Sequence, residues 1–143
     1  MSFFTSLAVS GSGLSAERLR VELASANLAN ANSTRTAEGG PYRRRDPVIQ
    51  AVSLGGGFGS DLDRAIRGVQ VQSVRIDPSQ PREVFDPGHP DADERGIVKM
   101  PNVTIVEELV NLRNAQRSFE ANLAALNVSR ELANRALRIG RSG

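Results

Sequence analysis

His89 is the only histidine in this 143-residue chain, so it is the first candidate for acid–base chemistry. A general base needs an orienting partner and a pocket. The neighbours of His89 are Gly88 and Pro90, which are typical of a turn. The sequence therefore predicts that His89 is a turn residue. Because no nucleophile, base and orienter stand in a recognisable arrangement, the chain is not expected to be an enzyme and no catalytic residue is assigned.

Asp91–Gly96 resembles the beginning of a calcium-binding loop, in which oxygen ligands alternate along the chain. The pattern fails because Arg95 occupies a ligand position and Asn102 stands where a bidentate glutamate is required. The chain has no cysteine, which excludes disulfides and thiolate metal sites. The segment is predicted to be a polar, solvated turn, and neither a metal site nor a cofactor is expected.

Two further segments have compositions found in nucleotide-binding and nucleic-acid-binding proteins. Gly55–Gly59 is rich in glycine, but no Gly-Lys-Ser/Thr follows it and no helix with the dinucleotide-binding pattern begins there. Arg43–Arg45 is basic, yet Tyr42 is the only aromatic residue beside it and the net charge of the chain is only +2. Neither a nucleotide nor nucleic acid is therefore expected as a partner. We interpret the arginine run as a solvated face, open to salt bridges with a neighbour.

The composition predicts a thin core. Hydrophobic residues make up 39% of the chain, but only five Phe and one Tyr are present, and no Trp. Such a core leaves partners to supply part of the burial. All seven prolines lie within residues 33–101, which divides the chain into three predicted parts. These are an N-terminal helix over residues 1–33, a β-rich or extended region over 34–101, and a C-terminal helix over 102–143.

The chain contains no run of 18 apolar residues, so a membrane-spanning helix is not expected. Its first six residues lack the basic leader and long apolar stretch of a secretory signal peptide. The sequence alone therefore predicts a cytosolic protein, or one exported by a route that reads no such signal.

The N-terminal segment has a heptad spacing. Leu7, Leu14, Val21 and Leu28 recur every seven residues, which predicts a coiled-coil-type helix. Two glycines, Gly11 and Gly13, each weaken that helix by about 1 kcal/mol relative to Ala. They are tolerable where another backbone must approach closely. A cluster of asparagines then predicts the end of the helix: Asn27, Asn30 and Asn32.

The C-terminal segment carries two heptad ladders and is predicted to be one helix over 103–139. Thr104 and Glu107 have the spacing of a capping box at its start. The first ladder is Ile105, Leu112, Phe119, Leu126 and Ala133, and the second, offset by four, is Leu109, Gln116, Leu123, Arg130 and Leu137. We interpret the polar residues of the second ladder as lying at the edge of the apolar stripe, where Arg130 can reach solvent.

The middle region is predicted to contain short strands at 47–52, 69–71 and 74–76, with a flexible turn at Gly55–Gly57 and turn-rich connectors at 77–81 and 86–90. The fold class is therefore α+β. Long N- and C-terminal helices pack as an antiparallel coiled-coil-like hairpin, and short β-hairpins and extended segments lie between them in the chain.

The terminal ladders allow two interpretations that can both hold. They can form an ordinary helical hairpin within the chain, or their leftover apolar stripes can be buried between subunits. The candidate subunit-interface residues are Leu7, Gly11, Leu14, Val21, Asn27, Leu28, Asn30, Asn32, Ile105, Leu109, Leu112, Phe119, Leu123, Leu126 and Leu137.

Several motifs resemble those of one family. Ala26–Ser33 looks like the Asn-rich signature of flagellar rod and hook axial proteins. Gly40–Arg44, with Val48, is similar to the stretch after it in proximal-rod members. Asp86–Asp93 is the most specific match, and it runs on to Leu109. Arg117–Asn122 resembles the C-terminal helix motif. The motifs cover nearly the whole chain and keep their order.

The resemblance implies a structural subunit of the bacterial flagellar basal-body rod, which polymerises helically across the periplasm and transmits torque. It implies copies of the chain itself and the rod proteins FlgB, FlgF and FliE as partners, and export through the flagellar type III apparatus. It also implies terminal regions that are disordered before assembly. The alternatives are another axial flagellar subunit, or a soluble coiled-coil adaptor.

Overall fold

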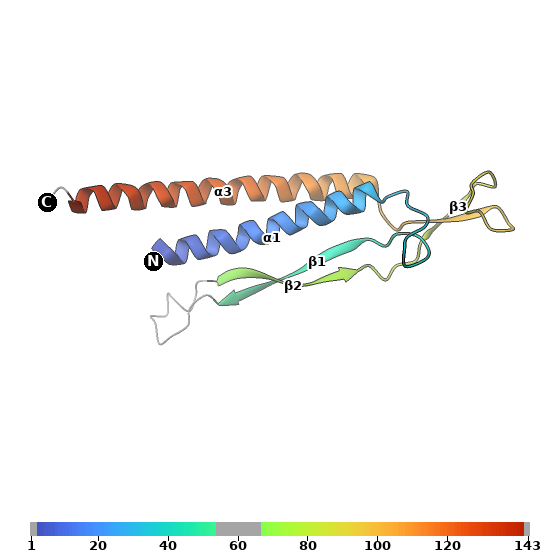
Figure 1. Ribbon diagram of the computed structural model, residues 1–143, viewed down its shortest axis with the longest axis horizontal. Helices are drawn as coiled ribbons and strands as arrows, with labels where there is room; N and C mark the ends of the chain where they lie inside the picture. Colours follow the sequence, from blue (N-terminus) through green and yellow to red (C-terminus); the bar gives the residue numbers. More distant parts are fainter. Residues whose placement is uncertain (1–2, 54–66, 142–143) are drawn as a thin grey trace. The chain divides into compact units, whose positions relative to one another are not determined.

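The computed structural model describes residues 3–53 and 67–141. Its elements follow in the order α1 (Phe3–Ala29), β1 (Arg45–Ser53), β2 (Arg67–Ile76), β3 (Arg82–Phe85), β4 (Ile97–Met100) and α3 (Ile105–Arg141) (Figure 1). The predicted α+β class, with long terminal helices packed together and short β-hairpins between them in sequence, is confirmed. The predicted turn at Gly55–Gly57 lies outside the described residues.

The described residues form two compact units. One contains residues 3–19, 48–53, 67–73 and 114–141, and the other contains residues 20–47 and 74–113. Each unit therefore combines a piece of both terminal helices with part of the middle region.

Helix α1 ends where the asparagines begin, as predicted. After Ala29, the side-chain amide of Asn30 donates a hydrogen bond to the Ala26 carbonyl (2.9 Å). The hydroxyl of Ser33 in turn donates to Asn30 Oδ1 (3.1 Å). The Ala26 carbonyl also accepts a hydrogen bond from the backbone N of Asn30 (3.1 Å), so Asn30 closes the end of the helix with both its backbone and its side chain. The Asn-rich segment is thus a helix stop that folds back on its own helix.

Helix α3 begins directly after Thr104, whose carbonyl accepts the hydrogen bond of Glu108 N (3.0 Å). That is the position of an N-cap residue. The helix runs for 37 residues, which corresponds to about 55 Å at 1.5 Å per residue. Glu131 and Arg135, one helical turn apart, form an exposed ion pair. Gly140 lies within the helix.

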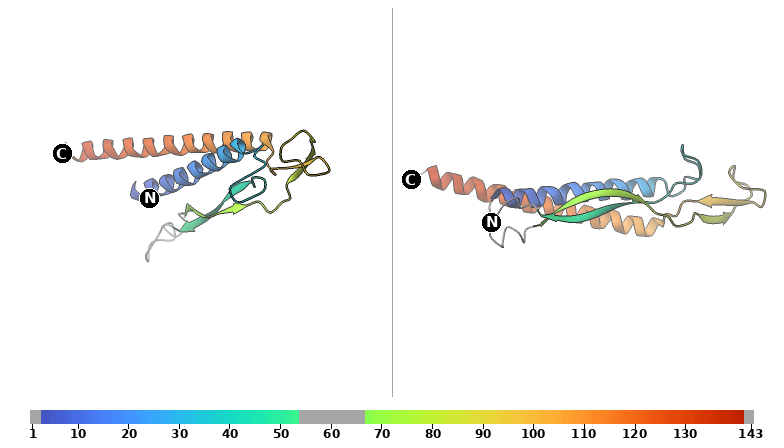
Figure 2. Two further views of the ribbon diagram at one scale, coloured as in Figure 1. Left: turned by 45° about the vertical axis from the view of Figure 1, so that its right-hand side comes forward. Right: turned by 90° about the horizontal axis from the view of Figure 1, so that it is seen from below.

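In the first unit, α1 and α3 lie side by side over small residues (Figures 1 and 2). Ala16 of α1 and Ala115 of α3 are fully buried. A Cβ added at Gly13 would lie 3.0 Å from Asn122 Nδ2, so the missing side chain allows α3 to approach closely. A Cβ at Gly11 would meet no atom within 4 Å, so only Gly13 is needed for the close approach of α1 and α3.

The first heptad ladder of α3 packs inward, but its predicted companion does not. Leu112, Phe119 and Leu126 are half-buried, whereas Leu123 and Leu137 are exposed. A second heptad line completes the buried side of α3. It lies three positions after the first ladder and consists of small and polar residues: Glu108, Ala115, Asn122 and Ser129. Small side chains bring the two helices close, and the apolar line offset by four faces outward.

Strands β1 and β2 form a two-stranded sheet. The two short runs predicted at 69–71 and 74–76 belong to one continuous strand, β2. Within the first unit, Ser12 of α1 holds this strand: its hydroxyl donates to the Val9 carbonyl (2.7 Å) and accepts a hydrogen bond from Val69 N (3.1 Å). A helical serine thus satisfies a strand N–H group.

The second unit contains a hairpin that the sequence analysis missed. Strands β3 and β4 pair antiparallel, with Arg82 opposite Met100 and Phe85 opposite Ile97. The polar segment between them is a turn, as predicted: Asp93 Oδ1 accepts hydrogen bonds from Arg95 N (2.8 Å) and Ile97 N (2.9 Å). These two hydrogen bonds hold the pKa of the Asp93 carboxyl below its ordinary value, and the bond from Ile97 N contributes most.

His89 is also a turn residue, as predicted. Its backbone N donates to the Asp86 carbonyl (3.2 Å), and its Nδ1 accepts a hydrogen bond from Asp91 N (3.0 Å). The imidazole is therefore engaged with the backbone of its own turn.

Candidate assembly interface

Helix α3 carries many large apolar side chains that are exposed. We define the outer surface of α3 as its nine exposed large apolar residues: Ile105, Val106, Leu109, Val110, Leu123, Val128, Leu132, Leu137 and Ile139. They are between 41% and 75% exposed. Soluble monomers rarely leave so many large apolar side chains along one helix without a partner. This surface is therefore the first candidate for contact with another chain.

The second unit is held together by a buried polar cluster, which we call the polar clamp. Its centre is Glu108 of α3, whose side chain is 1% exposed. Glu108 Oε1 accepts a hydrogen bond from Arg44 Nε (2.6 Å), and Oε2 accepts one from Asn27 Nδ2 (3.1 Å). A buried carboxylate is stable only when it is paired and hydrogen-bonded. Here one partner is a cation and the other is an amide.

Asn27 connects the clamp to the first strand. Its Oδ1 accepts hydrogen bonds from the Tyr42 hydroxyl (2.9 Å) and from Arg45 N (2.9 Å). Its Nδ2 also donates to the Arg45 carbonyl (2.9 Å). The clamp therefore joins the end of α1, the start of β1 and the start of α3. Among the described residues, no buried side-chain nitrogen or oxygen lacks a hydrogen-bond partner.

Arg44 contradicts the prediction of a solvated arginine run. Its side chain is 21% exposed and also pairs with Asp46 (2.5 Å). Burial by itself lowers the pKa of Arg44, but the hydrogen bond and the charges of Glu108, Asp46 and Asp77 together raise it. Arg43 and Arg45 are exposed, as expected. The central arginine is thus a structural cation, and only its neighbours remain available to other chains.

Comparisons with known proteins place this architecture in one family. The model described as "Flagella basal body rod protein" matches residues 7–35, and that described as "Flagellar basal body rod FlgEFG protein C-terminal" matches residues 94–139. "Flagellar basal-body rod protein FlgC" of Borreliella burgdorferi is 40% identical, over 97% of this chain and 98% of that protein. The Bacillus subtilis protein of the same name is 39% identical, over 99% of this chain and 100% of its own length. The chain belongs to the FlgC family of flagellar basal-body rod proteins.

It is therefore a structural subunit of the bacterial flagellar rod and not an enzyme, and the resemblance drawn from the sequence is confirmed. Within residues 3–53 and 67–141 of this FlgC-family chain, no three His, Asp or Glu side chains cluster so as to hold a metal ion. None of the helices in those ranges is long and apolar enough to cross a membrane.

The structure divides the interface residues predicted from the sequence into two groups. One group is at least half-buried within the chain: Leu7, Leu14, Val21, Asn27, Leu28, Asn30, Leu112, Phe119 and Leu126. The other group faces outward: Asn32, Ile105, Leu109, Leu123 and Leu137. Gly11 is half-buried, although nothing in the described chain would contact a side chain there. Two clamp residues, Arg44 and Glu108, were missed, although a glutamate on the inner side of α3 requires a buried partner.

The phenol of Tyr42 offers a direct test of the clamp in solution. Burial raises the pKa of Tyr42 above its ordinary value of 10.0, while the nearby Arg45 opposes the rise and Glu108 adds to it. The protonated phenol is therefore favoured by folding, and this stabilisation is present below a pH of about 10 and is lost as the pH rises through the folded pKa.

Because Tyr42 is the only tyrosine and no tryptophan is present, alkaline titration followed by ultraviolet absorbance reports this phenol alone. The expected midpoint lies above 10.0 in the folded chain and close to it in denaturant. Equal midpoints in both conditions would show that Tyr42 is not buried in the clamp.

Proposed function

We propose that the chain is a proximal-rod subunit that assembles helically with copies of itself and with the rod proteins FlgB, FlgF and FliE. In this proposal it transmits torque across the periplasm. The observation that supports the proposal most strongly is the outer surface of α3, whose large apolar side chains are between 41% and 75% exposed. An open helical polymer forms when one patch of a subunit meets a different patch of the next and the rotation does not close.

Torque transmission requires interfaces that do not slip. A helix of 37 residues offers many small contacts along its length, so the load on each is low. The inner contact with α1 uses small side chains and positions the helix pair closely. The outward residues Leu109, Leu123 and Leu137 would then pack against helices of neighbouring subunits. Gly11, with open space beside it, would let a neighbouring helix approach.

The polar clamp has a mechanical role in this proposal. It ties the end of α1 and the start of α3, which would be buried among subunits, to the start of β1 in the same chain. A hydrogen-bonded ion pair at that joint resists rotation better than apolar packing alone, because its geometry is directional. Strain applied to the helices would therefore reach the β region.

We further propose that the chain reaches the rod through the flagellar type III export apparatus, without a cleaved signal peptide. This part of the proposal rests on family membership.

Deletion of the gene from its own bacterium tests the proposed function. The deletion strain should not swim, and its basal bodies should lack a completed rod. Expression of the full chain should restore both. Normal swimming of the deletion strain would contradict the proposal.

A further inference from the structure

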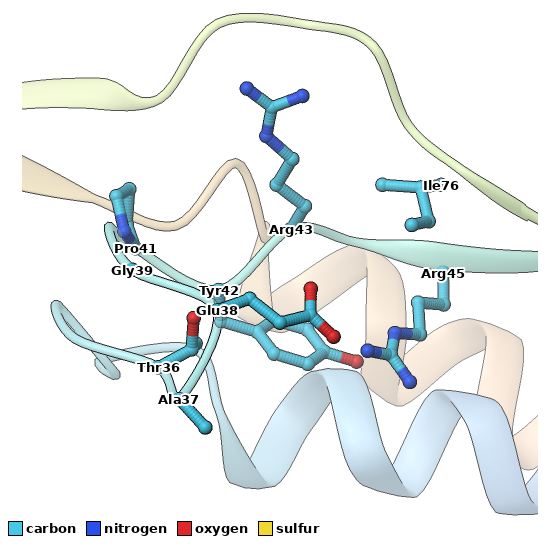
Figure 3. A pocket seen from close by; sticks show the side chains of 9 residues that line it. All are labelled: Thr36, Ala37, Glu38, Gly39, Pro41, Tyr42, Arg43, Arg45 and Ile76. Atoms are coloured by element: carbon cyan, nitrogen blue, oxygen red, sulfur yellow. The ribbon is translucent and has the colours of Figure 1, made fainter.

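A pocket of about 480 Å³ opens in the second unit beside the start of β1 (Figure 3). Its lining residues that matter here are Glu38, Pro41, Tyr42, Arg43, Arg45 and Ile76. The Tyr42 ring and the ring of Pro41 give it an apolar wall, and Ile76, which is 49% exposed, gives another. In Figure 3 the side chain of Arg43 extends away from the Tyr42 ring, whereas the guanidinium group of Arg45 lies close to it, with Cζ 5.7 Å from the ring centroid. Two arginines against one glutamate leave the pocket positively charged.

An exposed aromatic side chain, flanked by acidic residues, lies on the β3–β4 hairpin of the same unit. Phe85, at the end of β3, is 73% exposed. One edge of its ring rests on the hairpin, since a Cβ added at Gly96 would lie 3.0 Å from Phe85 Cε2. The ring is thus supported on one side and open on the other. Glu83 and Asp86 flank it, and both are exposed.

We propose that Phe85 of one copy inserts into this pocket of a second copy. The proposal rests on the proposed rod assembly and names one of its contacts. The ring would pack against Ile76 and Pro41, as aromatic anchors do at the centres of interfaces. The carboxylates of Glu83 and Asp86 would then lie close to the guanidinium groups that border the pocket.

Charge and symmetry both favour a second copy as the occupant. The segment 82–100 supplies one large apolar ring and five carboxylates against three cations, Arg82, Arg95 and Lys99. The pocket supplies two guanidinium groups, one carboxylate and apolar walls, so the two surfaces are complementary in net charge and in apolar character. The hairpin and the pocket are different patches of one chain. A contact between different patches repeats from subunit to subunit and produces an open helical array, as a rod requires.

Engineered cysteines can test this contact cleanly, because the chain has none of its own. Cells would express the unaltered chain together with two tagged variants, Phe85→Cys and Ile76→Cys. The unaltered chain keeps rods assembled even if a variant assembles poorly by itself. After mild oxidation of isolated basal bodies, a mixed disulfide carrying both tags is expected, since bridging requires the two Cα atoms to come within about 7 Å.

In the matched control, the cells express Arg75→Cys instead of Ile76→Cys, together with Phe85→Cys. Arg75 is also exposed, but its side chain points to the opposite face of β2. The mixed disulfide should be several-fold weaker with this control. Basal bodies that contain both variants but give no disulfide, or an equal yield with the control, would overturn the Phe85 contact and leave rod assembly standing. Absence of every variant and of the unaltered chain from basal bodies would overturn the proposed function instead.

Discussion

Replacing Leu123→Asp is expected to stop rod assembly and swimming while the free chain keeps its helical content. Leu123 is 41% exposed and belongs to the outer surface of α3, so the substitution costs little inside the chain. In an assembled rod it would bury a carboxylate against apolar neighbours, which is far more costly than losing the roughly 2 kcal/mol of one buried leucine. The same defect recurs in every copy. Swimming assays and electron microscopy of basal bodies measure the outcome.

Leu112→Asp is the informative comparison. Leu112 is half-buried on the inner side of the same helix, so its replacement should lower the melting temperature of the free chain as well as stop swimming. Normal swimming of the Leu123→Asp strain would count strongly against the outer surface as a subunit interface.

Breaking the polar clamp should have the largest effect on the stability of the free chain. Arg44→Met leaves the Glu108 carboxylate buried without its cation, and the free energy of unfolding is expected to fall by about 3 kcal/mol. Urea denaturation followed by circular dichroism measures the change. Arg43→Met, at the exposed neighbour, should change the free energy by no more than about 0.5 kcal/mol.

The double variant Arg44→Met/Glu108→Leu separates the pair from the individual residues. It removes both charges, so no uncompensated carboxylate remains, and part of the lost stability should return. A double variant as unstable as the sum of the two single variants would show that Arg44 and Glu108 act independently. That result would contradict the clamp as a coupled unit.

The terminal helices were predictable from the sequence because their physical signals are local. Heptad spacing from Leu7 to Leu28 and from Ile105 to Leu137 indicates helices, and the asparagines after Leu28 indicate where the first one stops. The β1–β2 hairpin also followed from short runs of β-branched residues. These signals lie within each segment, so they do not depend on knowing which segments meet.

The side of α3 that faces α1 could not be predicted in this way. Heptad spacing favours both ladders, but the closest approach to α1 uses the line of small and polar residues that includes Ala115 and Asn122. Apolar periodicity does not distinguish a face covered by the same chain from one covered by another chain. In a polymer subunit, apolar residues such as Leu109 and Leu123 can therefore face outward.

Two other features were missed for related reasons. Strands β3 and β4 have four residues each, and β3 (Arg82–Phe85) is exposed throughout, so no alternation marks it in the sequence. In the clamp, Glu108 binds Arg44, which lies 64 positions earlier in the chain, and Asn27, which lies 81 positions earlier. Asn27 was taken for a helix stop and Arg44 for a solvated cation, because each interpretation used only the neighbouring residues.

A density map of the intact basal body at side-chain resolution would test the central claim most directly. The proposal predicts this chain in the proximal rod, with Leu109, Leu123 and Leu137 of each copy covered by helices of adjacent subunits. A map in which these leucines face solvent, or in which the chain lies outside the rod, would contradict it.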